Sequence, residues 1–333
     1  MILTTAIEIP KGACRIGYED PILLMGSCFA DNIGRKLSEH KFNVDQNPFG
    51  TLYNPTSIAQ SLERLLDPVS FSSSDLFQHE GSYHSFAHHS RFSATEESSC
   101  LEQINSRLDR SSRFLSKARI LIITLGTAYV YRLKESGTVV ANCHKLPEKL
   151  FERSMLSVDA ITQEWSGLLD KLWKNNRQLQ VLFTVSPIRH WKDGAHGNQL
   201  SKATLLLAIE QLQQRFPQQI HYFPAYELMM DELRDYRFYA DDMLHPSALA
   251  IDYIWQRFAE TQLSDEAQAL AKEWLSIQKA IDHKPFQPKS ENYRKFLLQT
   301  LLKIERINDK IPSFATEEEN ELKRRLKQFE YGI

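Results

Sequence analysis

Cysteine is scarce in this chain of 333 residues, and the four cysteines form no C-x-x-C pair. The sequence therefore predicts reduced thiols rather than a disulfide framework or a zinc site. Excess charge is lacking as well, because 40 Lys and Arg residues against 42 Asp and Glu residues leave a net charge of -2. This balance lacks the excess of basic residues that is typical of proteins that bind nucleic acid or an anionic membrane. The cysteines are Cys14, Cys28, Cys100 and Cys143.

Long apolar runs are also missing. No stretch approaches the roughly 18 consecutive apolar residues of a membrane-spanning helix. The first residues, Met1 to Ala6, lack the basic region and the apolar run of a secretory signal. The sequence therefore predicts a cytoplasmic protein without membrane association, whose partners are small molecules or other proteins.

Short apolar runs alternate with helix-like segments over residues 1–262. Continuous runs such as 120–123 and 181–183 are typical of strands buried on both faces of a parallel sheet. We therefore expect a three-layer α/β domain with a doubly wound parallel sheet over 1–262. The predicted strands are 22–25, 119–125, 179–185 and 219–223, and the predicted helices are 31–41, 55–66, 99–116, 157–174, 200–216 and 247–262.

From residue 264 onward the composition shifts to long polar helices. The last of them opens with Thr316 as a cap and three Glu residues and carries Lys and Arg later, an order that suits the helix dipole. We expect residues 263–333 to form a helical C-terminal extension that packs onto the sheet domain or mediates self-association. Its predicted helices are 264–281, 290–309 and 316–329.

The first predicted strand runs into Gly26-Ser27-Cys28, directly before the helix predicted from Asp31. A turn from strand to helix presents free backbone N–H groups and the positive end of a helix dipole, which stabilise an anion. Ser27 or Cys28 would act as the nucleophile beside these N–H groups and this helix dipole. The alternative is that these residues only form a tight turn.

A carboxylate and an imidazole stand near the end of the predicted sheet domain, at Asp242 and His245. This spacing lets a loop or a first helical turn place both groups against a nucleophile elsewhere in the chain. His245 would act as the general base, and Asp242 would fix its tautomer. The alternative is that Asp241 or Asp242 caps a helix that begins at Pro246 or Ser247.

An early nucleophile followed by a late Asp-x-x-His resembles the SGNH/GDSL hydrolase superfamily, and the sequence from Gly26 to Ala30 resembles the GSCFA family of bacterial proteins within it. The resemblance runs over about 1–262 and places Cys28 where the superfamily has its serine. It implies a hydrolase or acyltransferase that acts without a cofactor on a small ester or thioester through an acyl-enzyme. The alternative is a catalytically silent binding module on the same fold.

The resemblance also implies an oxyanion hole built from the N–H of the nucleophile, a glycine after a following strand, and the Asn of a Gly-x-Asn motif. Gly50 matches the glycine and Gly126 matches the start of the motif, but Ala128 stands in place of the Asn. Losing one such donor costs about 10²- to 10³-fold in rate. Asn54 and Asn142 are candidate substitutes, with Asx-turns as their alternative role.

Two further groups of residues bear on binding. Arg189 and His190 follow a predicted strand and would hold an anionic substrate group, or else form a solvated loop. Histidines also gather in and near an insertion at 68–98, but their spacing does not match a metal site, so the sequence predicts no bound metal. These histidines are His84, His88, His89 and His144.

Overall fold

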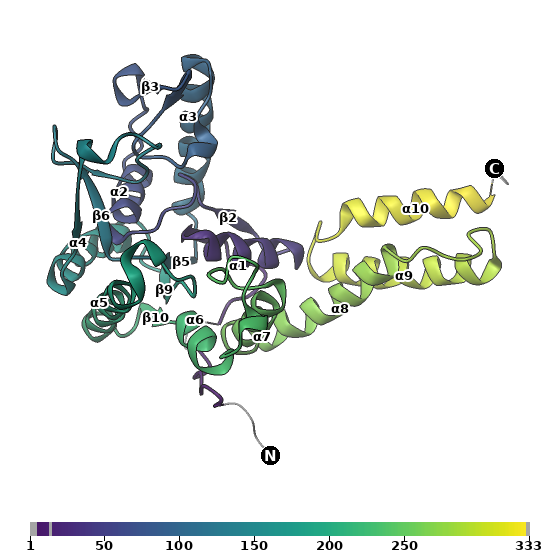
Figure 1. The fold of residues 1–333 in the computed structure, drawn as a ribbon. Coiled ribbons are helices and arrows are strands. Elements are labelled where there is room, and N and C mark those ends of the chain that lie inside the picture. Colours follow the sequence, from purple (N-terminus) through teal and green to yellow (C-terminus); the bar gives the residue numbers. More distant parts are fainter. Residues whose placement is uncertain (1–4, 13–14, 331–333) are drawn as a thin grey trace. The chain divides into compact units, whose positions relative to one another are not determined.

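Five parallel strands form the central sheet of the structure, a computed structural model that describes residues 5–12 and 15–330 (Figure 1). Their order is β10-β9-β5-β1-β2, and the predicted doubly wound α/β fold is confirmed. Every residue of β1 and of β5 is buried, which explains their continuous apolar runs. The strands are β1 (Ile22–Gly26), β2 (Val44–Gln46), β5 (Ile120–Leu125), β9 (Gln180–Val185) and β10 (Ile220–Tyr222).

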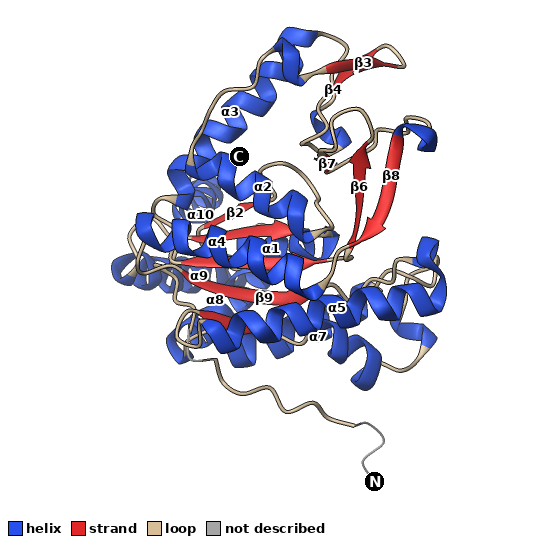
Figure 2. Cartoon of the chain, turned by 90° about the vertical axis from the view of Figure 1, so that its left-hand side faces the viewer, coloured by secondary structure: helices blue, strands red, loops and turns tan. Residues whose placement is uncertain are grey.

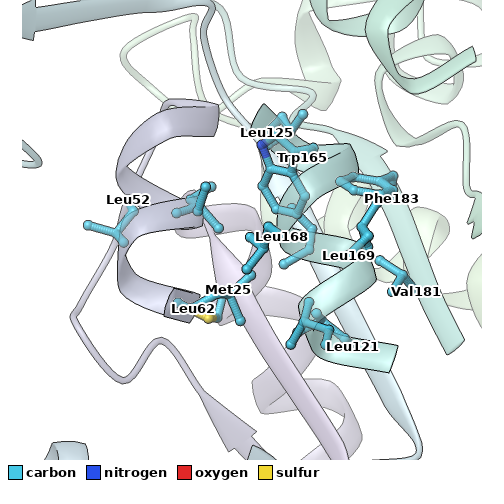
Figure 3. Packing of buried hydrophobic residues seen from close by; sticks show 14 of the residues in the cluster. Met25, Leu52, Leu62, Leu121, Leu125, Trp165, Leu168, Leu169, Val181 and Phe183 are labelled. Atoms are coloured by element: carbon cyan, nitrogen blue, oxygen red, sulfur yellow. The ribbon is translucent and has the colours of Figure 1, made fainter. Parts of the chain in front are cut away.

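Helices cover both faces of this sheet. On one face, Met25 and Phe183 of the strands belong to the same buried cluster as Leu62 and Trp165 of two covering helices (Figure 3). Successive residues of a strand point to opposite faces, so the neighbours of these strand residues face the other layer. The helices of this unit are α1 (Cys28–Glu39), α2 (Pro55–Leu66), α3 (Glu97–Leu115), α4 (Val158–Asn175), α5 (Gly194–Arg215), α6 (Ala225–Glu227) and α7 (Ala248–Gln262).

Helices α1 and α7 lie side by side. Lys36 of α1 pairs with Asp252 of α7 at 2.7 Å, and the rings of His40 and Trp255 approach to 5.0 Å between centroids. Helix α1 begins three residues earlier than the sequence predicts, because Ser27 rather than a later residue caps it. Cys28 is therefore the first residue of the helix.

The strand order changes direction at β1, because β2 lies on one side of it and β5, the next strand of this sheet along the chain, lies on the other. Strand β1 pairs with β2 on one side and with β5 on the other, and Gly26 lies opposite Thr124. Gly26 has φ +139°, and a Cβ there would lie 2.1 Å from the carbonyl oxygen of Thr124, so only glycine fits. Ligands of such sheets bind outside the carboxyl ends of the strands at this reversal. Cys28 follows β1 directly and lies at that point.

Two smaller sheets extend the unit. Strands β7, β6 and β8 form a separate antiparallel sheet, whose β6 and β8 stand upright at the end of the central strands in Figure 2. The small strands are β3 (Phe77–His79), β4 (Ser82–His84), β6 (Tyr129–Leu133), β7 (Val139–Val140) and β8 (Phe151–Met155). Short helical turns span Ser73–Asp75, Ser90–Phe92, Glu148–Leu150, Trp191–Asp193, Leu228–Glu232 and Tyr236–Phe238.

The chain divides into two compact units, Met1–Leu263 and Ser264–Ile333. The second consists of the three predicted helices, α8 (Asp265–Ile281), α9 (Glu291–Lys310) and α10 (Thr316–Glu330). Ser264 and Ser290 cap the first two, and the ring of Trp274 packs edge-on against that of Phe314 at 5.4 Å. In the part of the chain that the structure describes, no helix is long and apolar enough to cross a membrane.

Candidate active site

Ser27 and Cys28 have different environments although they are adjacent. Ser27 is 1% exposed, and its Oγ accepts a hydrogen bond from the backbone N–H of Phe29 as the cap of α1. This structural role of the hydroxyl argues against Ser27 as a nucleophile. Cys28 is a free, partly buried thiol in the first turn of the helix.

Burial raises the pKa of the Cys28 thiol, and the Asp31 carboxylate raises it further. Hydrogen bonds from the backbone of Cys28 and Phe29, together with the charge of Lys202, act in the opposite direction. Desolvation is the largest of these effects and outweighs the hydrogen bonds at the helix N-terminus. The side-chain charge that favours the thiolate is that of Lys202.

Asp31 is held in place beside the thiol. Its two carboxylate oxygens accept hydrogen bonds from Asn47 Nδ2 at 2.7 Å and Thr51 Oγ1 at 3.1 Å. Asn47 Oδ1 in turn accepts from the backbone N–H of Gly26 at 2.8 Å. This network ties the loop after β2 to the turn that carries Cys28.

Asp242 and His245 form a hydrogen-bonded pair. Nδ1 of His245 lies 2.5 Å from Oδ2 of Asp242, while Oδ1 accepts from the backbone N–H groups of Leu244 and His245 at 2.9 Å each. These bonds lower the pKa of Asp242 to about 2 and keep it ionised. Ser247 caps α7, so the alternative in which Asp241 or Asp242 caps this helix is wrong.

The two glycines expected in the oxyanion hole already use their N–H groups. The N–H of Gly50 donates to the Asn47 carbonyl at 2.8 Å, and that of Gly126 donates to the Tyr53 carbonyl at 2.7 Å. The assignment of both as oxyanion donors is therefore wrong in this conformation. The reason is that the loop from Asn47 folds back across the ends of β1 and β5 and takes up these donors.

The two asparagines offered as substitutes have local roles. Asn54 caps α2, since Oδ1 accepts from the N–H of Ser57 at 2.8 Å and Nδ2 donates to its Oγ at 3.0 Å. Asn142 accepts from the N–H of His144 at 2.8 Å in an Asx-turn. Both asparagines line the same cavity.

A cavity of about 610 Å³ opens beside Tyr53 and His190. The two rings meet edge-on at 5.6 Å, and a Cβ on Gly126 would lie 3.1 Å from His190 Nε2. Burial of the Tyr53 hydroxyl raises its pKa, and the charge of Cys28 adds to this shift. The further lining residues include Thr51, Asn54, His89, Thr127, Tyr129, Tyr131, Asn142, Cys143, Lys192 and Asp193.

His190 lines this cavity and lies within electrostatic reach of His245. Burial, together with the charges of Lys202, Arg153 and His245, lowers its pKa to about 4, so these three groups lie within electrostatic reach of it. Arg189 faces elsewhere: its guanidinium lies over the Trp191 ring at 5.1 Å and lines a second cavity of about 480 Å³ together with Asp242. The predicted anion-binding pair is thus divided between two cavities.

Lys202 is a site residue that the sequence analysis missed. It is 1% exposed, and its Nζ donates to the carbonyls of Gly126 at 2.7 Å and Ser186 at 2.8 Å. Its signal in the sequence is its place at the start of the buried stripe of α5, which continues through Leu205 and Ile209. A lysine on the apolar face of a helix is rarely buried without a function or a partner.

Other thiols and metal ligands complete the inventory. Cys100 is buried, Cys143 lines the cavity and has a pKa raised to about 11 by burial, and Cys14 lies outside the described residues. Over residues 5–12 and 15–330, no three or more His, Cys, Asp or Glu side chains gather in a way that would hold a metal ion.

Comparisons with known proteins give a family match. The model of the GSCFA family matches residues 21–258, and that of the GSCFA domain protein, C-terminal domain, matches residues 274–328. A comparison with curated proteins finds no match. Among solved structures, the chain is similar to a carbohydrate esterase family 3 protein from Talaromyces cellulolyticus, with 9% identity, a TM-score of 0.36, and coverage of 76% of this chain and 99% of that one. A second is a carbohydrate esterase whose active site displays divergent catalytic and non-catalytic binding functions, with 12% identity, a TM-score of 0.36, and coverage of 79% and 68%.

Proposed function

The chain belongs to the GSCFA family, and we propose that it is a hydrolase or acyltransferase of the SGNH type that acts on an ester or thioester through an acyl-enzyme at Cys28. The observation that carries this proposal is the 2.5 Å hydrogen bond between Asp242 and His245 Nδ1. It leaves Nε2 of His245 to accept a proton, as a general base requires. The thiol at the sheet reversal supplies a nucleophile at the position where such folds bind ligands.

The reaction would proceed in two steps, acylation of Cys28 and deacylation. Sγ of Cys28 attacks the acyl carbonyl while His245 accepts the thiol proton, and the same proton then passes to the departing alcohol or thiol. Water or a second alcohol, deprotonated by His245, attacks the thioester carbonyl, the acid or new ester leaves, and Sγ of Cys28 takes the proton back from His245. Because burial raises the pKa of the Cys28 thiol, the proposal needs this general base and does not rely on a preformed thiolate.

The negative charge on the tetrahedral oxygen would lie at the N-terminus of α1. The glycine donors expected from the family resemblance are occupied, so the backbone N–H of Cys28 and the helix dipole remain for this role. Ala128 offers no side-chain donor. The proposed enzyme therefore stabilises its oxyanion with fewer amides than the superfamily pattern.

A binding module without catalysis is the second candidate. The observation that favours it is that the N–H groups of Gly50 and Gly126 are bonded to backbone carbonyls. In that case the cavity beside Tyr53 and His190 would hold an ester or acyl compound without turning it over.

Chemical labelling tests the proposal directly. The full chain is treated with a chloroacetamide and, separately, with a fluorophosphonate, and the modified residues are mapped by mass spectrometry. We expect chloroacetamide to label Cys28 faster than the buried Cys100 or the high-pKa Cys143, and a bound ester substrate to protect it. Labelling of Ser27 by the fluorophosphonate, or no protection by any ester or thioester, would contradict the assignment of Cys28.

A further inference from the structure

Lys202 is a buried cation without an acidic partner. Other buried charges of this unit are paired: Asp45 with Arg107, and Glu232 with Arg257 at 3.7 Å. Lys202 instead has two carbonyl oxygens, and within the described part of the chain no carboxylate forms an ion pair with it. A buried ammonium is costly without a counter-ion, so an anion that forms beside Nζ stabilises the protonated lysine.

The two carbonyls place the ammonium at the proposed active site. Gly126 follows β5 and Ser186 follows β9, so Nζ joins the carboxyl ends of two neighbouring strands, at the end of the sheet where Cys28 follows β1. An ammonium has three donors, and these bonds use two of them. The third N–H remains for a thiolate, a water molecule or a bound substrate.

The groups around Lys202 and Cys28 decide which charges can pair. The Tyr226 ring lies 5.4 Å from Nζ, and Lys202 lies close enough to His190 to shift its titration. Around Cys28, the titratable groups are Asp31 on α1, which opposes the thiolate, and Tyr53 before α2. Among the described residues that shift the titration of the thiol, the cation is Lys202.

We propose that Lys202 is the counter-ion of the Cys28 thiolate and of the oxyanion formed on it, and that it supplies the positive charge at a site where Ala128 replaces an amide donor. In this role Lys202 acts through its charge and transfers no proton. The part concerning the oxyanion rests on the proposed function, whereas the part concerning the thiolate does not.

The titration of the two groups agrees with this pairing. Burial lowers the pKa of Lys202 to about 7, and the charge of Cys28 raises it. In the reverse direction, the charge of Lys202 lowers the pKa of Cys28. Each charge therefore favours the other.

Alkylation of Cys28 across a pH series tests the pairing without any ester. In Lys202→Met, we expect the alkylation midpoint to move to higher pH and the rate near neutral pH to fall about tenfold, because removal of the cation leaves fewer thiolates. The matched control is Lys171→Met, an exposed lysine paired with Glu63, which should leave the midpoint in place. Continued protection of the buried Cys100 shows that the variant is folded. An unchanged midpoint in folded Lys202→Met would overturn the inference.

A reciprocal measurement leaves the buried lysine intact. The titration of Lys202 is followed by NMR of its Cε or Nζ in the parent chain and in Cys28→Ala, and loss of the thiolate should lower the pKa of Lys202. An identical titration in both would overturn the inference even if Lys202→Met does not fold. Neither measurement needs turnover. A shifted alkylation midpoint in a protein that hydrolyses no ester would therefore support the pairing and refute the proposed function. Ester turnover with an unshifted midpoint would support the proposed function and refute the pairing.

Discussion

Replacing Cys28 with alanine is expected to lower the rate of ester and thioester hydrolysis by about 10³-fold or more, because the other candidate nucleophile at the β1–α1 turn, Ser27, is buried and caps the helix. Cys28→Ser should also lose most activity. A serine hydroxyl is a weaker nucleophile, and the site has no amide side chain at Ala128 to compensate through the oxyanion. Rates are measured on a panel of aryl esters and acyl thioesters.

Two control variants separate the nucleophile from its surroundings. Ser27→Ala removes the cap of α1 and should cost about 1 kcal/mol of stability with a much smaller effect on rate. Cys143→Ser changes another free thiol, at the cavity, and should retain nearly the parent rate. Full activity in Cys28→Ser together with loss of activity in Ser27→Ala would move the nucleophile to Ser27.

Asp242→Asn is expected to lower the rate by about 10²- to 10⁴-fold. The amide can donate to Nδ1 of His245, which favours the wrong tautomer and leaves the other nitrogen unable to accept the thiol proton. The loss can fall at the lower end of this range because the side chains of His245 and Asp242 are 50% and 48% exposed. Water can then replace part of the hydrogen bonding to Nδ1 of His245.

The matched control for this substitution is Asp241→Asn, which removes the neighbouring, exposed carboxylate and leaves the hydrogen bond to His245 in place. It should turn over substrate at the parent rate. Equal losses in both variants would show a general effect of charge and would remove Asp242 from the catalytic pair. The comparison is made on kcat/KM over a pH series, so that a shift of the titrating base can be distinguished from a loss of binding.

The fold was predictable because its signals are local. Strands β1, β5 and β9 are buried on both faces and appear as continuous apolar runs, and the helices between them carry one apolar face each. Strand β2 escaped prediction because it is three residues long and holds Asp45, whose charge is neutralised by an arginine far along the chain. An edge strand of this length has no apolar pattern of its own.

The site was predictable only where its members are neighbours in the sequence. Asp242 and His245 are three residues apart, and their pairing follows from one turn. The oxyanion assignments were wrong because the N–H groups of Gly50 and Gly126 are taken by backbone carbonyls of a loop whose path the sequence does not reveal. Lys202 was missed because its acceptors are the ends of two strands that only the folded sheet brings together.

The central claim is a covalent acyl group on Cys28, and the most direct measurement is the mass of that intermediate. The full chain is mixed with 4-nitrophenyl acetate, quenched in acid and digested, with Cys28→Ala treated in parallel. We expect the peptide containing Cys28 to gain the mass of one acetyl group, which hydroxylamine removes, and the parallel variant to gain none. An unmodified Cys28 in a sample that has turned over the ester, or an acetyl group placed on Ser27, would contradict the account.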